Sequence, residues 1–104
     1  MEKDVPNKTL PPLHPGEYLK EEFLIPLKIS QYRLAKELKV TEYTISKIVR
    51  GKSSITADMS MRLSRFFGNS AEFWLNLQKE YELDCAKERF DELEINNISP
   101  FVYA

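Results

Sequence analysis

The stretch 30–52, SQYRLAKELKVTEYTISKIVRGK, combines short polar side chains with cations at a spacing that suits contact with DNA. Lys47 can donate hydrogen bonds to guanine O6 or N7, and Glu42 can accept one from cytosine N4. Tyr43 can reach a thymine methyl group or a phosphate. The predicted chemistry is therefore hydrogen bonding to base edges and phosphates, by Gln31, Thr41, Glu42, Tyr43, Thr44, Ser46, Lys47, Arg50 and Lys52.

Two short helices would position these side chains. Ser30 and Thr41 are favourable N-cap residues, because each hydroxyl can accept a hydrogen bond from an unpaired amide of the first turn. Gly51 stands where a helix-ending residue with positive φ is expected. Only Lys39 and Val40 lie between the first helix and the second cap, which is typical of a helix-turn-helix. Inward-facing apolar residues follow helical spacing at Leu34, Ala35, Leu38, Ile45, Ile48 and Val49.

The alternative is an ordinary capped helix pair with a solvated polar face, and the charge distribution argues against it. The whole chain has a net charge of -1, but residues 28–65 carry nine Lys and Arg against three Asp and Glu, which is +6. Residues 1–27 carry -2 and residues 66–104 carry -5. This asymmetry suggests a polyanion partner for the middle and another partner surface elsewhere. An unevenly charged surface without a partner remains the alternative.

The remaining residues predict a small all-α protein of five helices with a short C-terminal tail. Pro15 suits the start of a first helix, which Pro26 is expected to stop or bend. Thr56 and Ser70 are expected to cap two further helices, the first of them ended by Gly68. We predict a flexible N-terminal arm at 1–13, a DNA-binding domain at 14–92, and a tail at 93–104 that suits dimerisation.

Catalytic, metal-binding and cofactor functions are not expected. His14 is the only histidine and Cys85 the only cysteine, too few for an ordinary zinc site. We interpret Cys85 as a buried or half-buried structural thiol, His14 as a residue that caps or packs the first helix, and Trp74 as core, with a partner-binding anchor as the alternative for Trp74. The three scattered glycines form no phosphate-binding loop.

Membrane functions are not expected either. No apolar run approaches the roughly 20 residues that a membrane span needs. The N-terminal sequence MEKDVPNKTLPP lacks the apolar core of a signal peptide. A single cysteine fits a reducing cytoplasm.

Five segments together resemble the HigA-type antitoxins, also called VapI-like proteins, of the lambda-repressor-like (XRE) helix-turn-helix superfamily. They are LHPGEYLKEEFLIPL at 13–27, ISQYRLAKELKV at 29–40, TISKIVRGKSSIT at 44–56, MRLSRFFG at 61–68 and SAEFWLNLQKEYEL at 70–83. HPGE and EFWLNLQ are the specific parts. Lys39 departs from the family, which usually has Gly in the turn. A positive φ there would cost roughly 1 kcal/mol, which affects the turn geometry and not the fold.

The resemblance implies a lambda-repressor-like five-helix bundle and a cytoplasmic bacterial homodimer. Members of the family repress their own operon at a palindromic operator. They also neutralise a RelE/HigB-like toxin, which is an mRNA endonuclease. Two other functions stay open: an orphan transcriptional regulator without a toxin, and a protein-interaction module without DNA binding. The basic segment favours DNA binding over the second of these.

Surfaces for the two protein partners can be predicted from composition. Exposed apolar residues at a chain end are a solubility liability, so we expect a dimer interface that contains Leu83, Phe90, Ile98, Phe101 and Val102. The acidic stretch Glu80 to Glu94 is the predicted toxin contact, because ribosome- or RNA-directed toxins tend to be basic. The stretch Glu17 to Glu22 is the second candidate. The alternative is that these carboxylates only keep the helices soluble.

Overall fold

The computed structural model describes residues 11–103, and every regular element among them is helical. The elements are α2 (Pro15–Leu19), the π-helical turn η1 (Lys20–Leu24), α3 (Ile25–Leu27), α4 (Gln31–Leu38), α5 (Glu42–Val49), α6 (Ala57–Phe67), α7 (Ala71–Glu88) and the 3₁₀ turn η2 (Ile95–Asn97). Because α2, η1 and α3 follow one another without a break, they form one helix. The predicted all-α fold of five helices is therefore confirmed for the described part of the chain.

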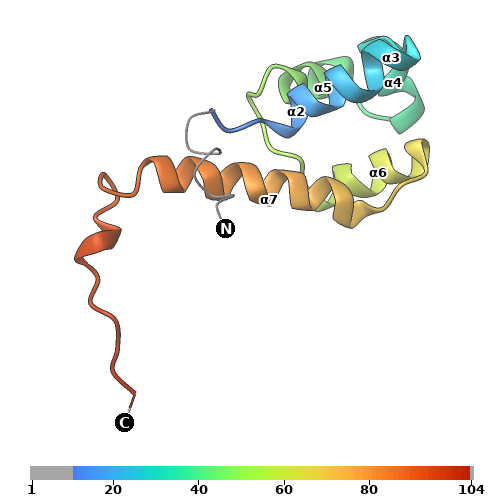
Figure 1. Cartoon of the computed structure of the whole chain (residues 1–104). Coiled ribbons are helices and arrows are strands. Elements are labelled where there is room, and N and C mark those ends of the chain that lie inside the picture. The colour runs from blue at the N-terminus through green and yellow to red at the C-terminus, as the bar shows by residue number, and fades with distance from the viewer. Residues whose placement is uncertain (1–10, 104) are drawn as a thin grey trace.

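The helices form two layers (Figure 1). The first layer contains α2 to α5, and the second contains α6 and α7, which pack against each other. Contacts between α4 and α6 and between α2 and α7 join the layers. Each of the five helices contributes at least one fully buried side chain to the core; these include Leu19, Leu34, Ile45, Leu63 and Trp74, all 0% exposed. The prediction of Trp74 as a core residue is confirmed.

All four predicted N-caps form as expected from their residue types. The Ser30 hydroxyl accepts from the Arg33 amide at 3.0 Å, and the Thr41 hydroxyl accepts from the Thr44 amide at 3.1 Å. Thr56 and Ser70 cap α6 and α7 in the same way. These hydroxyls satisfy amides that have no partner within their own helix.

Four helices end at or next to a residue with positive φ: Lys28 at 58°, Lys39 at 63°, Gly51 at 74° and Gly68 at 83°. At the end of α4, the Val40 amide donates to the Ala35 carbonyl at 3.0 Å and the Lys39 amide to the Lys36 carbonyl at 3.2 Å. This is a Schellman motif, and it satisfies two of the last carbonyls of α4. The expected strain at Lys39 is thus present, and the turn keeps its usual form.

Two outcomes were predicted for Pro26: that it stops the first helix, which is wrong, and that it bends the helix, which stays a prediction. The helix continues through Pro26 and ends only at Lys28, so the proline does not stop it. The irregularity lies before the proline, where the Ile25 amide donates to the Lys20 carbonyl in a π turn. A proline ring in a regular α-helix clashes with the carbonyl four residues earlier. The wider π turn relieves this clash and lets the helix continue.

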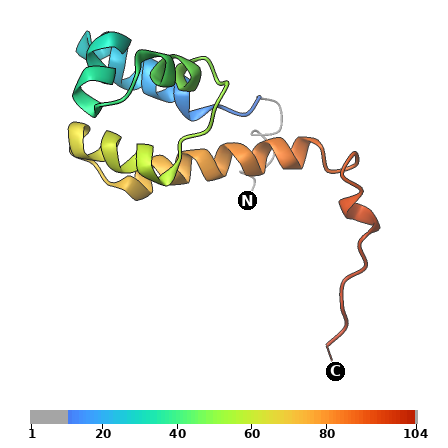
Figure 2. The ribbon, with the colours of Figure 1, turned by 180° about the vertical axis from the view of Figure 1, so that it is seen from behind.

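The last part of the chain leaves the bundle. The second half of α7 extends beyond the other helices, and the residues after it run away from them (Figure 2). Phe101, Val102 and Tyr103 are 76%, 84% and 86% exposed. The other residues of the predicted dimer interface, Leu83, Phe90 and Ile98, are also exposed. The boundaries predicted at 13 and 93 stay a prediction, and most of the N-terminal arm lies outside the described residues.

Candidate nucleic-acid interface

The N-terminal half of α5 carries the polar side chains predicted to contact DNA. Thr41 and Thr44 bond through their hydroxyls at 2.8 Å, which fixes both rotamers at the start of the helix. Glu42 and Tyr43 lie exposed beside them, and Tyr43 is 67% exposed. An uncovered tyrosine and short hydroxyls at a helix N-terminus suit the end of a helix that enters a DNA groove.

Lys47 and Tyr43 form a pair on this surface. The Lys47 ammonium lies 5.3 Å from the centre of the Tyr43 ring, within range of a cation–π contact. The two residues are four positions apart, so they lie one above the other on a helix. The contact keeps the lysine stem extended toward the N-terminal end of α5. It therefore holds the predicted base-reading cation ready without neutralising its charge.

The predicted phosphate contacts lie at the other end of α5. Arg50 Nε donates to the Ser46 hydroxyl at 3.1 Å, and the guanidinium remains exposed. Lys52 follows Gly51, and its amide donates to the Lys47 carbonyl at 2.8 Å in the helix-ending motif. Gln31 is half-buried at the first position of α4. The structure thus joins three pairs of the predicted residues: Thr41–Thr44, Tyr43–Lys47 and Ser46–Arg50. Gln31 lies on α4, which packs against α5.

The start of the first helix lies directly against the end of α5. A Cβ atom at Gly16 would lie 1.7 Å from the Ile48 carbonyl oxygen, so only glycine allows this approach of two backbones. Sequence reasoning missed this role of Gly16. The HPGE segment was a possible signal, but the partner of its glycine cannot be read from the chain.

His14 joins this region to α7. Its Nδ1 accepts from the Gly16 amide at 2.8 Å, which confirms the predicted cap of the first helix. The ring also contacts Tyr81 edge-on, with 4.8 Å between centroids. Burial lowers the pKa of His14 below its ordinary value, partly offset by a backbone hydrogen bond with Ser53 and by the charge of Glu17. His14 therefore binds the start of α2, the loop after α5 and α7 together in its neutral form.

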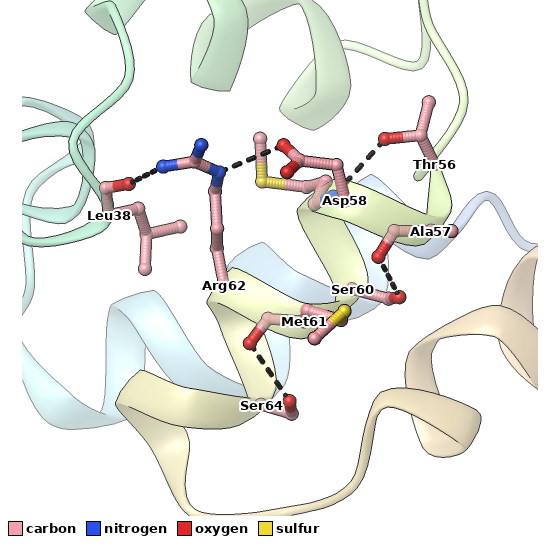
Figure 3. Close-up of polar contacts among 9 residues, drawn as sticks. Leu38, Thr56, Ala57, Asp58, Ser60, Met61, Arg62 and Ser64 are labelled. Carbon is pink, nitrogen blue, oxygen red and sulfur yellow. Dashed lines mark hydrogen bonds and ion pairs between the residues drawn. The ribbon is translucent and has the colours of Figure 1, made fainter.

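Two cations of the predicted basic surface bind other groups of the protein. Arg62 donates from Nη1 to the Leu38 carbonyl at 2.7 Å and from Nε to Asp58 at 2.8 Å (Figure 3). Arg33 pairs with Glu37 at 3.9 Å. Of the nine cations between 28 and 65, Arg33 and Arg62 thus pair with carboxylates of the same segment, and these pairs are already counted in its net charge of +6.

Metal binding and membrane spanning, neither of which the sequence predicts, can be examined among the described residues. No three His, Cys, Asp or Glu side chains between 11 and 103 are grouped so as to hold a metal ion. None of the helices in this range is long and apolar enough to cross a membrane. Cys85 is half-buried, as predicted.

Comparison with known proteins identifies the family. Residues 19–74 match the helix-turn-helix family. The chain is 46% identical to virulence-associated protein I of Dichelobacter nodosus, over 88% of this chain and 82% of the relative. It is 37% identical to antitoxin HigA-1 of Vibrio cholerae, over 78% of this chain and 76% of that protein. The solved structure of Pseudomonas aeruginosa antitoxin HigA with the higBA promoter has a TM-score of 0.80 and 44% identity, covering 88% of this chain and 99% of that one.

The match to this chain covers most of the length of each relative, and none of the relatives is an enzyme by name or family. The expected resemblance to HigA-type and VapI-like proteins is confirmed by sequence and by structure. The chain therefore belongs to the helix-turn-helix family and, within it, to the non-enzymatic antitoxins of the HigA and VapI type.

Proposed function

We propose that this protein is a sequence-specific DNA-binding antitoxin that represses its own operon and neutralises a RelE/HigB-like toxin. The observation that carries the DNA-binding part is the polar outer face of α5. There Tyr43 is 67% exposed, the Lys47 ammonium lies over its ring, and Thr41 caps the start of the helix. A similar protein has been solved with promoter DNA, which supports the same partner for this chain. A protein that acts on chromosomal DNA works in the bacterial cytoplasm.

The proposed DNA contacts divide by position along α5. Lys47 and Glu42 read base edges, while Arg50 and Lys52 contact phosphates on the flank, and Gln31 contacts the backbone from the start of α4. Base contacts specify a sequence, and phosphate contacts supply affinity that falls with salt. Substitutions of the base-reading residues should therefore change the sequence preference, and substitutions of the phosphate-contacting residues should change the salt dependence of binding.

We propose that the protein binds as a homodimer. One helix-turn-helix covers half a site, and a two-fold dimer presents two recognition helices about 34 Å apart or a multiple of that spacing. The exposed tail residues Phe101 and Val102, with Ile98, Phe90 and Leu83 before them, supply the apolar area for the interface. Light scattering should give twice the monomer mass of 12.2 kDa at tens of micromolar. A monomer under these conditions would contradict the dimer.

The proposed toxin contact is the acidic stretch from Glu80 to Glu94. Residues 66–104 carry a net charge of -5, and most carboxylates of the stretch are exposed. Such a surface can steer and cover a basic toxin. The carboxylates Glu17, Glu21 and Glu22 on the first helix form the second candidate surface.

Co-expression with the protein encoded by the neighbouring reading frame tests the toxin contact. In one variant Asp91, Glu92 and Glu94 are replaced by their amides. In the matched control Glu17, Glu21 and Glu22 are replaced in the same way. We expect the first variant to lose rescue of growth and co-purification, and the control to keep both. If both variants still rescue growth, neither of these two sets of three carboxylates is needed for the toxin contact. If no neighbouring toxin exists, the chain is an orphan regulator.

A further inference from the structure

Arg62, on α6, caps the C-terminal end of α4, the helix that precedes the turn. Arg62 Nη1 donates to the Leu38 carbonyl oxygen at 2.7 Å, across 24 residues of sequence, and its Nε donates to Asp58 at 2.8 Å (Figure 3). We propose that Arg62 is a positioning residue for DNA recognition. It fixes the end of α4 and, through the short turn, the orientation of α5. The inference rests on the proposed DNA-binding function.

The Leu38 carbonyl lacks a backbone partner. The last carbonyls of an α-helix have no amide within the helix to accept from. At the end of α4 the Schellman motif pairs the Ala35 and Lys36 carbonyls with the Val40 and Lys39 amides. No backbone amide in the described part of the chain donates to the Leu38 carbonyl. Arg62 therefore supplies, from a different helix, a donor to the Leu38 carbonyl that the turn itself does not provide.

The guanidinium is held at both of its ends. Asp58 lies four residues before Arg62 on α6 and accepts from Nε, while Nη1 points to Leu38. Because the guanidinium is planar and rigid, fixing one edge aims the other. A lysine would present the same charge without a fixed direction. The arrangement thus defines the position of the Leu38 carbonyl relative to α6, whose buried residues Met59 and Leu63 anchor it in the core.

The contact is better suited to fixing a direction than to adding stability. Arg62 and Leu38 line an open cleft of about 370 Å³, together with Glu37, Lys39, Arg65 and Phe66. The Asp58 side chain is 71% exposed, and exposed ion pairs contribute little to folding free energy. Water in the cleft could satisfy the Leu38 carbonyl if Arg62 were absent. Water could not, however, hold α4 and α6 at one separation, and that separation passes to α5 through Lys39, Val40 and Thr41.

Arg62→Met tests the proposal, because methionine keeps most of the stem and removes the donors. Arg65→Met is the matched control, since it removes the same charge from the next turn of the same helix. Arg62→Lys keeps the charge but loses the planar guanidinium, which donates in two fixed directions. Affinity is measured for promoter DNA and for a scrambled duplex over a range of salt, well below the unfolding midpoint of each variant.

We expect Arg62→Met and Arg62→Lys to reduce the promoter-to-scrambled affinity ratio by about tenfold, near the lower range of what one mismatched base pair costs. The salt slope should stay near that of the parent for Arg62→Lys. The Arg65→Met variant should keep the affinity ratio. An unchanged ratio in the folded Arg62 variants would overturn the proposal. An equal loss in Arg65→Met would also overturn it, because charge alone would then explain the effect.

Hydrogen exchange of the Val40 amide gives a second readout that needs no DNA. We expect this amide to exchange faster in Arg62→Met than in Arg65→Met at matched global stability. If the parent protein binds no promoter DNA, the proposed function fails, and the exchange rates still decide whether Arg62 holds the turn. Equal exchange rates in the two variants would then overturn the positioning role.

Discussion

Replacing Gly16 with alanine should push the first helix away from α5. The new Cβ would lie 1.7 Å from the Ile48 carbonyl oxygen and 2.6 Å from its carbon. Unstrained carbon contacts lie at about 3.5–4.0 Å, so the two segments must separate by roughly 1.5–2 Å. The backbone of residue 16 fixes the new Cβ and the atoms it meets are main chain, so no side-chain rotation can relieve the clash. Overpacking typically costs about 1–3 kcal/mol, and a backbone clash belongs at the upper end or beyond.

The higher helix propensity of alanine partly offsets this loss of stability. Alanine is favoured over glycine by about 1 kcal/mol in a helix interior, and by less in the first turn, where Gly16 lies. We therefore expect Gly16→Ala to lower the free energy of unfolding by about 2–3 kcal/mol, a large part of the 5–15 kcal/mol typical of a domain. Urea unfolding followed by the fluorescence of Trp74, the only tryptophan, measures the change.

Gly68→Ala is a comparison variant, in which the added Cβ meets no other atom and only the backbone conformation carries a cost. Gly68 has a φ of 83°, and a Cβ there would meet nothing within 4 Å. Its substitution should cost only the strain of a left-handed conformation, about 1–2 kcal/mol. If Gly16→Ala loses no more stability than Gly68→Ala, the close approach of the two backbones does not limit this fold, and the reasoning is refuted.

Three further predictions concern single residues. Lys39→Gly should raise the free energy of unfolding by about 0.5–1 kcal/mol in urea titration, because it removes the strain of a positive φ and only part of that gain is lost to chain entropy; a destabilised variant would contradict this. Gln78→Leu should cost about 1–3 kcal/mol in the same assay, because the buried Ile55 amide loses the Gln78 Oε1 acceptor at 2.8 Å; an unchanged free energy of unfolding would contradict this. Because the pKa of His14 is lowered in the folded state, the unfolded chain takes up the proton first as pH falls below about 6.5. Stability should therefore be highest above pH 6.5 and decrease as pH falls toward the folded pKa, and His14→Gln should lessen this dependence.

Local features of the fold could be predicted from the sequence, because they depend on residues three to five positions apart. The caps at Ser30, Thr41, Thr56 and Ser70 are of this kind, as is the positive φ at Gly51. The positive φ at Lys39 followed from the turn geometry of the family, although the residue type disfavours it.

Contacts between distant segments could not be predicted. Arg62 reaches Leu38 across 24 residues, and Gln78 reaches Ile55 across 23. Counting charges along the chain treated Arg62 as a free cation, because nothing local marks it as a cap for another helix. The π turn before Pro26 was missed for a different reason: such a turn has no sequence signal as clear as a proline.

The candidate DNA-contacting residues were predicted more completely than the residues that support them. Polar residues on the outer face of α5 are visible from helical spacing alone. The pairing of Lys47 with Tyr43 also follows that spacing. Gly16 and His14, which hold the end of α5 in place, are recognisable only when the first helix lies beside it.

Binding of promoter DNA by Lys47→Ala and Arg50→Ala, measured over a range of salt, tests most directly the claim that α5 reads DNA. Lys47→Ala should cost about 1–3 kcal/mol of binding free energy on the promoter and relax the preference over scrambled DNA. Arg50→Ala should weaken all sequences alike and reduce the salt slope by about one unit. Unchanged affinity for both variants, with the fold intact by circular dichroism, would contradict the assignment of α5 as the recognition helix.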